Sequence, residues 1–418
     1  MSENIIKKKK ILWNLSDKEM SDFLDITETK LVKLENNEKL ISPTMKNKLE
    51  KFPDEFPFKK KFESKYNDFK FIDLFAGIGG IRLPFQKNGG ECVFSSEWNK
   101  HAKKTYFANY GDYPFGDITK ISSENIPDHD ILLGGFPCQA FSQAGKGEGF
   151  ADTRGTLFFE IQRILVAKRP KAFLLENVKK LLTHDSGKTF KTISSILEGN
   201  FEKREDLEKV LNDDVKKALE KKLNYWITFK ILKAADFGVP QNRERIFIVG
   251  FNKDYYGEQD FEEMFNWPEP LNNQLIKVKD ILEQDYVNSL DKDIYTISDK
   301  LYSGHLRRRI EHKEKGNGFG FSLYTGEEKY TNTLSARYYK DGSEILIDQS
   351  LYGKNPRFLT QRECARLQGF PENFVIDAIS RNEMYRQFGN SVCMKVITAI
   401  ADKMLFAMKE LEKNKKES

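Results

Sequence analysis

From Phe69 onward, short apolar segments alternate with segments of helical periodicity, and this alternation constrains the fold more than any other feature of the chain. Strands that alternate with helices favour an α/β domain with a doubly wound sheet. The predicted strands are Lys70–Phe75, Glu91–Ser95, Ile131–Leu133, Ala172–Leu175, Tyr225–Lys230 and Arg245–Val249. We therefore expect a sheet with helices on both faces.

The first 60 residues follow a different pattern and are predicted to form a separate all-α unit. Two short helical segments, residues 17–24 and 27–35, lie on either side of a tight break at Asp25 and Ile26. Ser16 and Thr27 stand where N-cap residues belong. Two helices around a tight turn resemble the DNA-binding helix-turn-helix of phage repressors, with an ordinary helical hairpin as the alternative. The apolar residues expected to face inward are Met20, Phe23, Leu24, Ile26, Leu31 and Leu34.

Other segments of the chain are distinguished by composition. Residues 53–61, with two prolines and a lysine cluster, are predicted to be a linker. The charged stretch 202–223 is predicted to be a solvated surface helix. Beyond about residue 268 the alternation of strands and helices is lost, and Gly-, Asn- and Tyr-rich and basic segments predict a second, irregular domain. A final helix is predicted over residues 392–411.

Composition excludes several classes of protein. Hydrophobic residues make up 39% of the chain and charged residues 31%, and no apolar run approaches the ~20 residues needed to span a bilayer. The lysine-rich N-terminus precedes no apolar segment, so no signal peptide is expected. The four cysteines have no paired spacing, which argues against a disulfide framework and a zinc site. The expected location of the protein is therefore the reducing cytoplasm. A net charge of +5 permits nucleic-acid binding without requiring it.

One cysteine lies in a distinctive turn. The sequence GGFPCQAFS at 134–142 places Cys138 in a Gly/Pro turn directly after the predicted strand at 131–133. A strand that ends in such a turn holds a thiol at the mouth of a sheet, where a nucleophile is useful. A small buried hydrophobe is the alternative for a free cysteine. The other cysteines, Cys92, Cys364 and Cys393, lie in apolar patterns and are predicted to be structural.

A Gly-rich turn follows the first predicted strand. The sequence FIDLFAGIGG at 71–80 predicts a buried strand, a turn and a helix, and glycines let the backbone approach a ligand closely. About 20 residues further on, Glu97 has the spacing of an acid that binds ribose hydroxyls. Trp98 offers an indole face for an adenine. Asp117, at the edge of a further predicted strand, adds an acceptor for an adenine amino group.

Taken in order, the motifs of residues 69–410 resemble those of bacterial DNA (cytosine-5)-methyltransferases of type II restriction–modification systems. The motifs are DLFAGIGG at 73–80, EW at 97–98, GDI at 116–118, PCQ at 137–139, ENV at 176–178, QNRER at 241–245, RECARLQGFP at 362–371 and QFGNSV at 387–392. The resemblance implies a Rossmann-like sheet that binds S-adenosylmethionine. It divides the chain into a helix-turn-helix-like DNA-binding domain (1–60), a catalytic and cofactor domain (66–268), a target-recognition domain (269–382) and a C-terminal helix (383–418) that returns to the catalytic domain.

The resemblance also assigns catalytic roles. A thiolate that adds to carbon 6 of cytosine makes carbon 5 nucleophilic, and the family's nucleophile maps onto Cys138. Glu176 maps onto the glutamate that protonates or hydrogen-bonds ring nitrogen 3. Arg243 and Arg245 map onto paired arginines, one expected to hold the carbonyl oxygen of the flipped base and the other to order the loop and the glutamate. A phosphate contact by one of them is the alternative, and no side chain is an obvious base for the proton on carbon 5.

The cofactor and DNA contacts follow from the same resemblance. The residues expected to contact S-adenosylmethionine are Phe75, Ala76, Gly77, Gly79, Glu97, Trp98, Asp117, Ile118, Pro137 and Asn390. The residues expected to contact DNA are Ser142 and Arg154 in a loop that closes over the flipped nucleotide, Thr333 at the backbone, Arg337 and Lys340 at base edges, and Arg307 and Arg308 at phosphates. No metal is expected.

The second domain also carries a prediction of the target. Residues 333–347 resemble enzymes that read CCWGG or CCNGG, and residues 315–321 resemble relatives that read CCGG. We therefore expect a palindrome in double-stranded DNA that begins with CC and ends with GG, methylated at the inner cytosine. A cognate restriction endonuclease would act on the same site without direct contact, and DNA binding would associate the protein with the nucleoid.

Other functions fit the sequence less well. An amino-methyltransferase would need an Asp/Asn-Pro-Pro-aromatic turn, which the sequence lacks. An RNA cytosine methyltransferase would share the PCQ and ENV motifs but should lack the large recognition insert and the repressor-like N-terminus. A transcriptional regulator acting through residues 1–60 is the alternative from another class, and we expect both functions to coexist. A nuclease would need a metal-binding cluster of carboxylates, which no motif provides.

Overall fold

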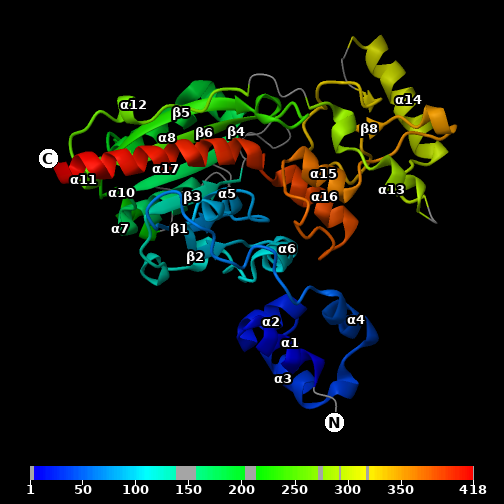
Figure 1. Ribbon diagram of the computed structural model, residues 1–418, viewed down its shortest axis with the longest axis horizontal. Helices are drawn as coiled ribbons and strands as arrows, with labels where there is room; N and C mark the ends of the chain where they lie inside the picture. Colours follow the sequence, from blue (N-terminus) through cyan, green and yellow to red (C-terminus); the bar gives the residue numbers. More distant parts are fainter. Residues whose placement is uncertain are drawn as a thin grey trace.

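The computed structural model describes residues 4–137, 157–202, 213–271, 276–290, 293–316 and 320–417. Figure 1 shows a sheet domain crossed by a long C-terminal helix, a second domain at one end, and a small helical lobe below. We call residues 4–51 the N-terminal lobe and residues 276–380 the second domain. Within the described ranges, no helix is long and apolar enough to cross a membrane. The same ranges contain no group of three or more side chains that could hold a metal ion.

Six strands form the central sheet in the order β2-β1-β3-β4-β6-β5. They are β1 Lys70–Leu74, β2 Glu91–Ser96, β3 Ile131–Gly135, β4 Ala172–Val178, β5 Tyr225–Lys233 and β6 Glu244–Asn252. Each matches a strand predicted from the sequence, and the α/β fold is confirmed. The first four strands are parallel, whereas β6 is antiparallel to β4 and β5. β6 reverses because a short connection joins it to β5, and strands joined in this way pair antiparallel.

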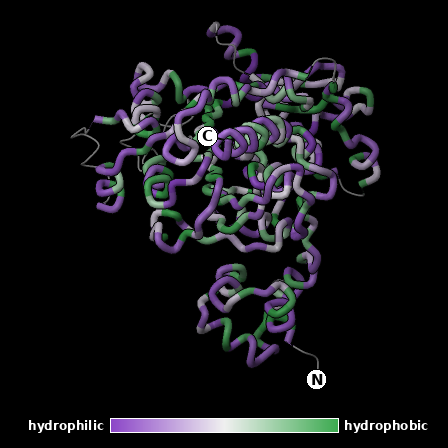
Figure 2. Tube along the Cα trace, turned by 60° about the vertical axis from the view of Figure 1, so that its left-hand side comes forward, coloured by the Kyte–Doolittle hydropathy of each residue, from purple (hydrophilic) through white to green (hydrophobic). Residues whose placement is uncertain are grey.

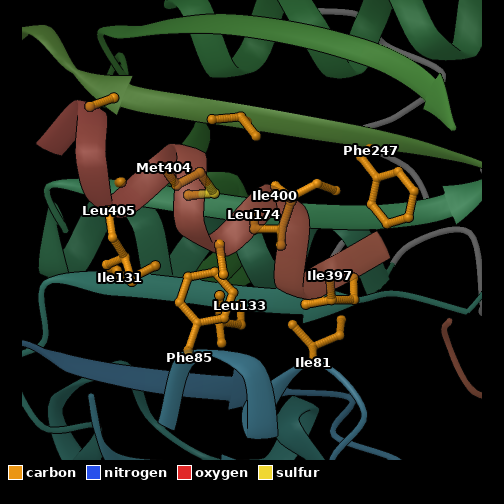
Figure 3. Packing of buried hydrophobic residues seen from close by; sticks show 14 of the residues in the cluster. Ile81, Phe85, Ile131, Leu133, Leu174, Phe247, Ile397, Ile400, Met404 and Leu405 are labelled. Atoms are coloured by element: carbon orange, nitrogen blue, oxygen red, sulfur yellow. The ribbon is translucent and has the colours of Figure 1, made fainter. Parts of the chain in front are cut away.

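Helices cover both faces of the sheet, and side chains alternate between two core layers. Ile131 and Leu133 of β3 belong to one layer and Leu132 to the other. The first face is covered by α5 (Arg82–Lys87), α11 (Lys253–Tyr256), α12 (Phe261–Met264) and α17 (Met394–Glu417), and the second by α7 (Leu157–Lys168), α8 (Lys188–Glu198) and α10 (Asp213–Leu219). Figure 3 shows Ile400 and Met404 of α17 packed over the strands. The predicted C-terminal helix is therefore confirmed.

Short helical turns complete the sheet domain: η2 Ile118–Lys120, η3 Ser123–Asn125, η5 Lys179–Leu182, η6 His184–Gly187 and η7 Ala234–Phe237. The charged stretch predicted as a solvated helix is described only in part, and α10 is the helix found there. Val215 and Ala218 of α10 are buried. Asp213, Asp214 and Lys217 of the same helix are exposed. The described part of the stretch is therefore a surface helix, as predicted, with one apolar face packed against the domain because two apolar residues one turn apart point inward.

The strand directions bring the candidate catalytic residues to one edge of the sheet. The carboxyl ends of β3 and β4 meet there, and β6 begins there because it runs the opposite way. Gly135 of β3 pairs in register with Glu176 of β4, and Val178 of β4 pairs with Arg245 of β6. The chain leaves this edge three residues before Cys138, which lies outside the described residues.

The second domain consists of short elements around a small core. Its elements are η8 Val278–Ile281, α13 Gln284–Asn288, α14 Asp299–Glu314, β7 Leu323–Tyr324, β8 Leu346–Ile347, η9 Ser350–Tyr352 and α15 Gln361–Leu367. A fully buried ion pair joins Arg357 to Glu363 through two hydrogen bonds of 2.8 Å. Glu363 also accepts from the backbone of Thr360 in a capping box. A buried pair is stable only when its remaining polar atoms are satisfied, and these contacts satisfy them. α16 (Arg381–Asn390) then leads to α17.

The N-terminal lobe contains α1 Ile5–Trp13, α2 Asp17–Leu24, α3 Glu28–Asn36, η1 Glu38–Leu40 and α4 Pro43–Lys51. Ser16 caps α2 in a capping box with Glu19. Asp25 ends α2 in the left-handed conformation (φ 61°). Thr27 then caps α3. Both helices predicted from the sequence are confirmed, because the cap residues fix their ends.

The segment predicted as a linker is packed against the sheet domain. Residues 52–69 contain no helix and no strand, in keeping with that prediction. Phe52 and Phe56 nevertheless pack with Phe107 of α6 (Lys100–Tyr110), with ring centroids 5.7 and 5.0 Å apart. Figure 2 shows the lobe below the body of the molecule. The lobe and α6 share one hydrophobic cluster. The phenylalanines of the linker segment join this cluster because large aromatic rings are stabilised by burial.

Candidate active site

An acid and an arginine from neighbouring strands form the centre of the site. Glu176 Oε1 lies 3.1 Å from Arg245 Nε, and the two side chains are 11% and 17% exposed. Burial raises the pKa of Glu176, and the positive charges of Arg245 and Arg243 partly offset that effect. A carboxyl whose pKa is raised by burial holds a proton closer to neutral pH. Glu176 therefore has the property that a general acid needs.

Arg243 ties together two segments that are distant in sequence. Its guanidinium is buried and donates to the carbonyl of Leu334 at 3.2 Å. It also donates to the carbonyls of Gly389 and Ser391, at 3.3 and 2.5 Å. The Thr333 hydroxyl donates to the carbonyl of Asn242 at 2.5 Å. The QNRER motif thereby joins the threonine of the second domain to the C-terminal end of α16, where Asn390 lies.

The Gly-rich turn and Glu97 form a second group at the same edge of the sheet. Gly77 and Gly79 have positive φ angles of 56° and 81°, which glycine adopts without strain. The Glu97 carboxylate accepts from the N–H of Gly77 at 2.8 Å and from the N–H of Asn99 at 2.7 Å. Burial raises the pKa of Glu97, and these backbone donors oppose the rise. Each oxygen keeps a second lone pair that a ribose hydroxyl could use.

Asp73 is a buried acid that the site prediction did not include. It lies in β1 just before the Gly-rich turn and is 1% exposed. Both carboxylate oxygens are buried without a hydrogen-bond partner among the described residues, and burial raises the pKa of the group well above its ordinary value. A buried acid with unused acceptors fits a positively charged or hydrogen-bonding ligand group. One acid among the apolar residues FIDL at 71–74 is the sequence signal that could have revealed it.

Several of the other predicted cofactor residues follow the ends of strands: Phe75 and Ala76 follow β1, Trp98 follows β2 and Pro137 follows β3. Phe75 is half-buried with a positive φ of 55°, and the side chain of Trp98 is open to solvent with an exposure of 78%. Phe115 forms a parallel bridge with Ser96, which confirms a further strand edge beside β2. Near it, Asp117 caps η2 and Ile118 is buried. Ala76 is buried, Pro137 is half-buried, and Asn390 is exposed at the end of α16.

Comparison with known proteins agrees with this geometry. The model of the C-5 cytosine-specific DNA methylase family matches residues 69–200 and 203–405. The chain belongs to this family. It is therefore a DNA (cytosine-5)-methyltransferase.

Similar proteins specify the class of the methyltransferase, and a solved structure shares its fold. The type II methyltransferase M1.ScrFI of Lactococcus lactis subsp. cremoris is 51% identical over 417 residues, which cover 99% of this chain and 96% of that one. The type II methyltransferase M.SsoII of Shigella sonnei is 48% identical over 97% of this chain and 99% of its own. These likenesses make the enzyme one of the type II restriction–modification class. The Dnmt2 methyltransferase of S. pombe shares the fold, with a TM-score of 0.60 at 18% identity over 81% of this chain and 98% of that structure.

The predicted DNA residues of the methyltransferase lie in two places. Thr333 is beside the QNRER motif, as described above, and Arg337 and Lys340 are exposed on the segment that follows it. Arg307 and Arg308 lie on α14, which Figure 1 places at the far end of the second domain from the sheet. Arg307 has 76% of its side chain exposed and lies 3.9 Å from Glu311 of the same helix, and Arg308 pairs with Asp341 at 3.3 Å. Cys138, Ser142 and Arg154 lie outside the described residues.

The described cysteines fit the structural role predicted for them. Cys364 and Cys393 are buried, and burial raises their pKa values. Burial raises the pKa of Cys92 to about 11. A thiol with a raised pKa is a poor nucleophile at neutral pH. Among the cysteines that the structure describes, none is therefore suited to the nucleophilic role that the sequence predicts for Cys138.

Proposed function

We propose that the methyltransferase modifies the inner cytosine of a short palindrome that begins with CC and ends with GG, using Cys138 as a covalent nucleophile. The observation that carries this proposal is the Glu176–Arg245 pair at 3.1 Å. Glu176 lies in register with Gly135, from which the chain continues to Cys138. An acid poised beside the segment that carries a thiol is the arrangement that addition to a cytosine ring requires.

The reaction balances as one addition, one methyl transfer and one elimination. The Cys138 thiolate forms a bond to carbon 6 while Glu176 protonates, or donates a hydrogen bond to, ring nitrogen 3. When bound, S-adenosylmethionine would supply an electrophilic methyl group to carbon 5, and its sulfur would keep the electron pair of the broken S–methyl bond and leave as the thioether. Ring nitrogen 3 then returns its proton to Glu176. A base then takes the proton from carbon 5, the electron pair re-forms the 5,6 double bond, and the sulfur leaves carbon 6. Arg245 is proposed to hold the glutamate and the base carbonyl, and the carbonyl contacts of Arg243 support an ordering role over phosphate binding.

S-adenosylmethionine fits the turn between β1 and β2. Asp73 offers buried acceptors without partners, and Gly77 brings open backbone to the same place, since a side chain added there would meet no atom within 4 Å. Glu97 is proposed to bind the ribose, and Phe75 and Trp98 to hold the adenine between them. Asp117, Ile118, Pro137 and Asn390 are proposed to complete the site.

The second domain is proposed to read the DNA. Arginine or lysine to guanine is the commonest specific contact in the major groove, which makes Arg337 and Lys340 the candidates for base edges. Arg307 and Arg308 are proposed to contact phosphates, Thr333 the backbone near the flipped base, and Ser142 and Arg154 the DNA around it. Base flipping would bring the cytosine to Glu176, because carbon 5 cannot be reached inside the duplex.

Bisulfite sequencing of plasmid DNA from cells that express the wild type or Cys138→Ser tests the activity and the target together. We expect protected cytosines at one palindrome of this kind in the wild type and none in the variant. Protection at both CCAGG and CCGGG would indicate CCNGG, and protection at only one of them a narrower target. Methylation outside sites that begin with CC and end with GG would overturn the proposed target.

The N-terminal lobe supports a second function, the control of transcription. Leu31 and Leu34 of α3 are buried, whereas Thr29, Lys30 and Lys33 are exposed on the same helix. Figure 1 shows α3 on the side of the lobe that faces away from the sheet domain. We propose that α3 enters a DNA groove at an operator upstream of the gene. A Lys30→Ala/Lys33→Ala variant should bind the upstream DNA more weakly yet methylate normally, and unchanged promoter binding would overturn this role.

A further inference from the structure

Helix α6 contacts both the Gly-rich turn and the N-terminal lobe. At its first turn, Asn99 caps the helix and donates its own N–H to Glu97 at 2.7 Å. Glu97 in turn holds the N–H of Gly77. The start of α6 is therefore joined by hydrogen bonds to the turn where we propose that the cofactor binds.

The last residue of α6 also reaches the Gly-rich turn. The Tyr110 hydroxyl donates to the carbonyl of Gly79 at 2.7 Å. The Tyr110 ring fills the space beside Gly79, where an added Cβ would lie 2.3 Å from a ring carbon. The guanidinium of Arg82 lies 4.3 Å from the centroid of the same ring. Tyr110 thus fixes the conformation of the turn without belonging to any motif of the sequence.

The opposite contacts of α6 are made with the lobe. Lys100 pairs with Asp25 at 2.5 Å, and the largely buried Lys103 pairs with Asp22. One turn further on, Phe107 lies in the aromatic cluster of the lobe, 5.7 Å from the Trp13 ring. Each end of α6 therefore makes one contact with the Gly-rich turn or its ligand Glu97 and another contact with the lobe.

We propose that α6 couples the cofactor site to the N-terminal lobe, with Tyr110 as the positioning residue of the Gly-rich turn. The proposal rests on the binding of S-adenosylmethionine proposed above. A ligand that orders the turn would order α6 and the surface on which the lobe docks. Coupling between two sites is reciprocal. If the bound cofactor stabilises the docked lobe by a given factor, then undocking the lobe lowers the affinity for the cofactor by the same factor. Operator binding through α3 would then respond to the supply of the methyl donor.

The coupling is measured on the full chain with S-adenosylhomocysteine as the probe. Hydrogen exchange of the α2 amides should slow when the probe binds to the wild type. Tyr110→Phe, which removes only the hydroxyl, should raise the Kd of the probe and the KM for S-adenosylmethionine by about five- to tenfold, the effect of one buried hydrogen bond. Its kcat at saturating cofactor should stay unchanged, because Tyr110 does not contact the reacting atoms.

A charge exchange tests the lobe side. Asp22→Lys should repel Lys103 and raise the Kd of the probe, and the double variant Asp22→Lys/Lys103→Asp should restore it. Lys46→Ala is the control, because Lys46 pairs with Glu38 inside the lobe, and it should leave the Kd unchanged. Equal Kd values in all variants, together with unchanged α2 exchange, would overturn the coupling alone. A wild type that does not bind the probe would overturn both the coupling and the proposed cofactor site.

Discussion

Asp73 shows how a single residue can serve binding at a cost in stability. The Asp73 carboxyl is buried without a hydrogen-bond partner among the described residues. Such a group is costly to bury in its charged form. We expect Asp73→Asn to raise the free energy of unfolding at pH 7–8 by about 1–3 kcal/mol. The same variant should weaken the binding of S-adenosylhomocysteine, since a neutral amide replaces the acid.

The pH dependence of stability follows from the same group. The folded pKa of Asp73 is raised well above its ordinary value, so the folded protein keeps a proton that the unfolded chain loses. Stability must then fall as pH rises from the unfolded pKa, about 3.9, through the folded pKa. Thermal unfolding from pH 4 to 9 should show a shallower decline for Asp73→Asn than for the wild type. If stability fell equally with pH in the wild type and the variant, the ionisation of Asp73 would not affect the free energy of unfolding.

Glu176 carries a third prediction at this scale. Glu176→Gln keeps the size of the side chain but removes the proton that ring nitrogen 3 would receive. We expect kcat to fall by about 10²–10⁴-fold, with the Kd of S-adenosylhomocysteine unchanged because Glu176 is not among the proposed cofactor residues. Glu91→Gln, at an exposed acid of β2, is the control and should keep full activity. A Glu176→Gln enzyme with wild-type kcat would exclude the proposed acid.

At the scale of elements, the Gly-rich turn depends on two glycines for different reasons. A Cβ at Gly79 would clash with Tyr110, whereas a Cβ at Gly77 would meet no atom within 4 Å. Both residues have a positive φ, which costs a side chain about 1–2 kcal/mol. We therefore expect Gly79→Ala to lower the unfolding temperature more than Gly77→Ala, both measured without cofactor. Equal losses would mean that the ring of Tyr110 moves aside freely.

The helices and strands were largely predictable because their signals are local. Ser16 and Thr27 mark helix starts by the chemistry of their own side chains, and each apolar strand is read from its own residues. The reversed direction of β6 follows from its short connection to β5, but its place between β4 and β5 depends on pairing with a strand distant in sequence, which no local pattern records. The packing of Phe56 against Phe107 was missed for the same reason, since the two rings come from segments 51 positions apart.

The candidate site was predictable only where motifs carry it. Glu176 and Arg245 were assigned through motifs, and the sheet places them together. The carbonyl contacts of Arg243 and the hydroxyl contact of Tyr110 join distant segments of backbone. A contact to a backbone carbonyl leaves no mark on the sequence of the acceptor, so neither contact could be predicted.

At the scale of the whole molecule, α14, which carries the three consecutive arginines 307–309, lies at the end of the second domain away from the sheet (Figure 1). Arg307 on this helix is largely exposed and its contact with Glu311 is long, at 3.9 Å, so it is available to a phosphate. Each phosphate contact releases counterions and adds about 0.9 to the salt slope of the binding constant. We expect Arg307→Ala to reduce the slope by about one, with the target unchanged. Lys354→Ala is the control, because Lys354 pairs with Asp293 in the same domain. If Lys354→Ala reduced the salt slope as much as Arg307→Ala, α14 would have no specific role in phosphate binding.

The central claim is that Cys138 forms the bond to cytosine while Glu176 and Arg245 hold the base. The most direct measurement uses a duplex of the target with 5-fluorocytosine at the inner position, incubated with enzyme and S-adenosylmethionine and analysed by denaturing gel and mass spectrometry. Fluorine at carbon 5 cannot leave as a proton does, so the bond to sulfur should persist. We predict a stable protein–DNA adduct for the wild type, mapped to the peptide of Cys138, and none for Cys138→Ser. An adduct that persists in Cys138→Ser, or an active wild type that forms none, would contradict the account.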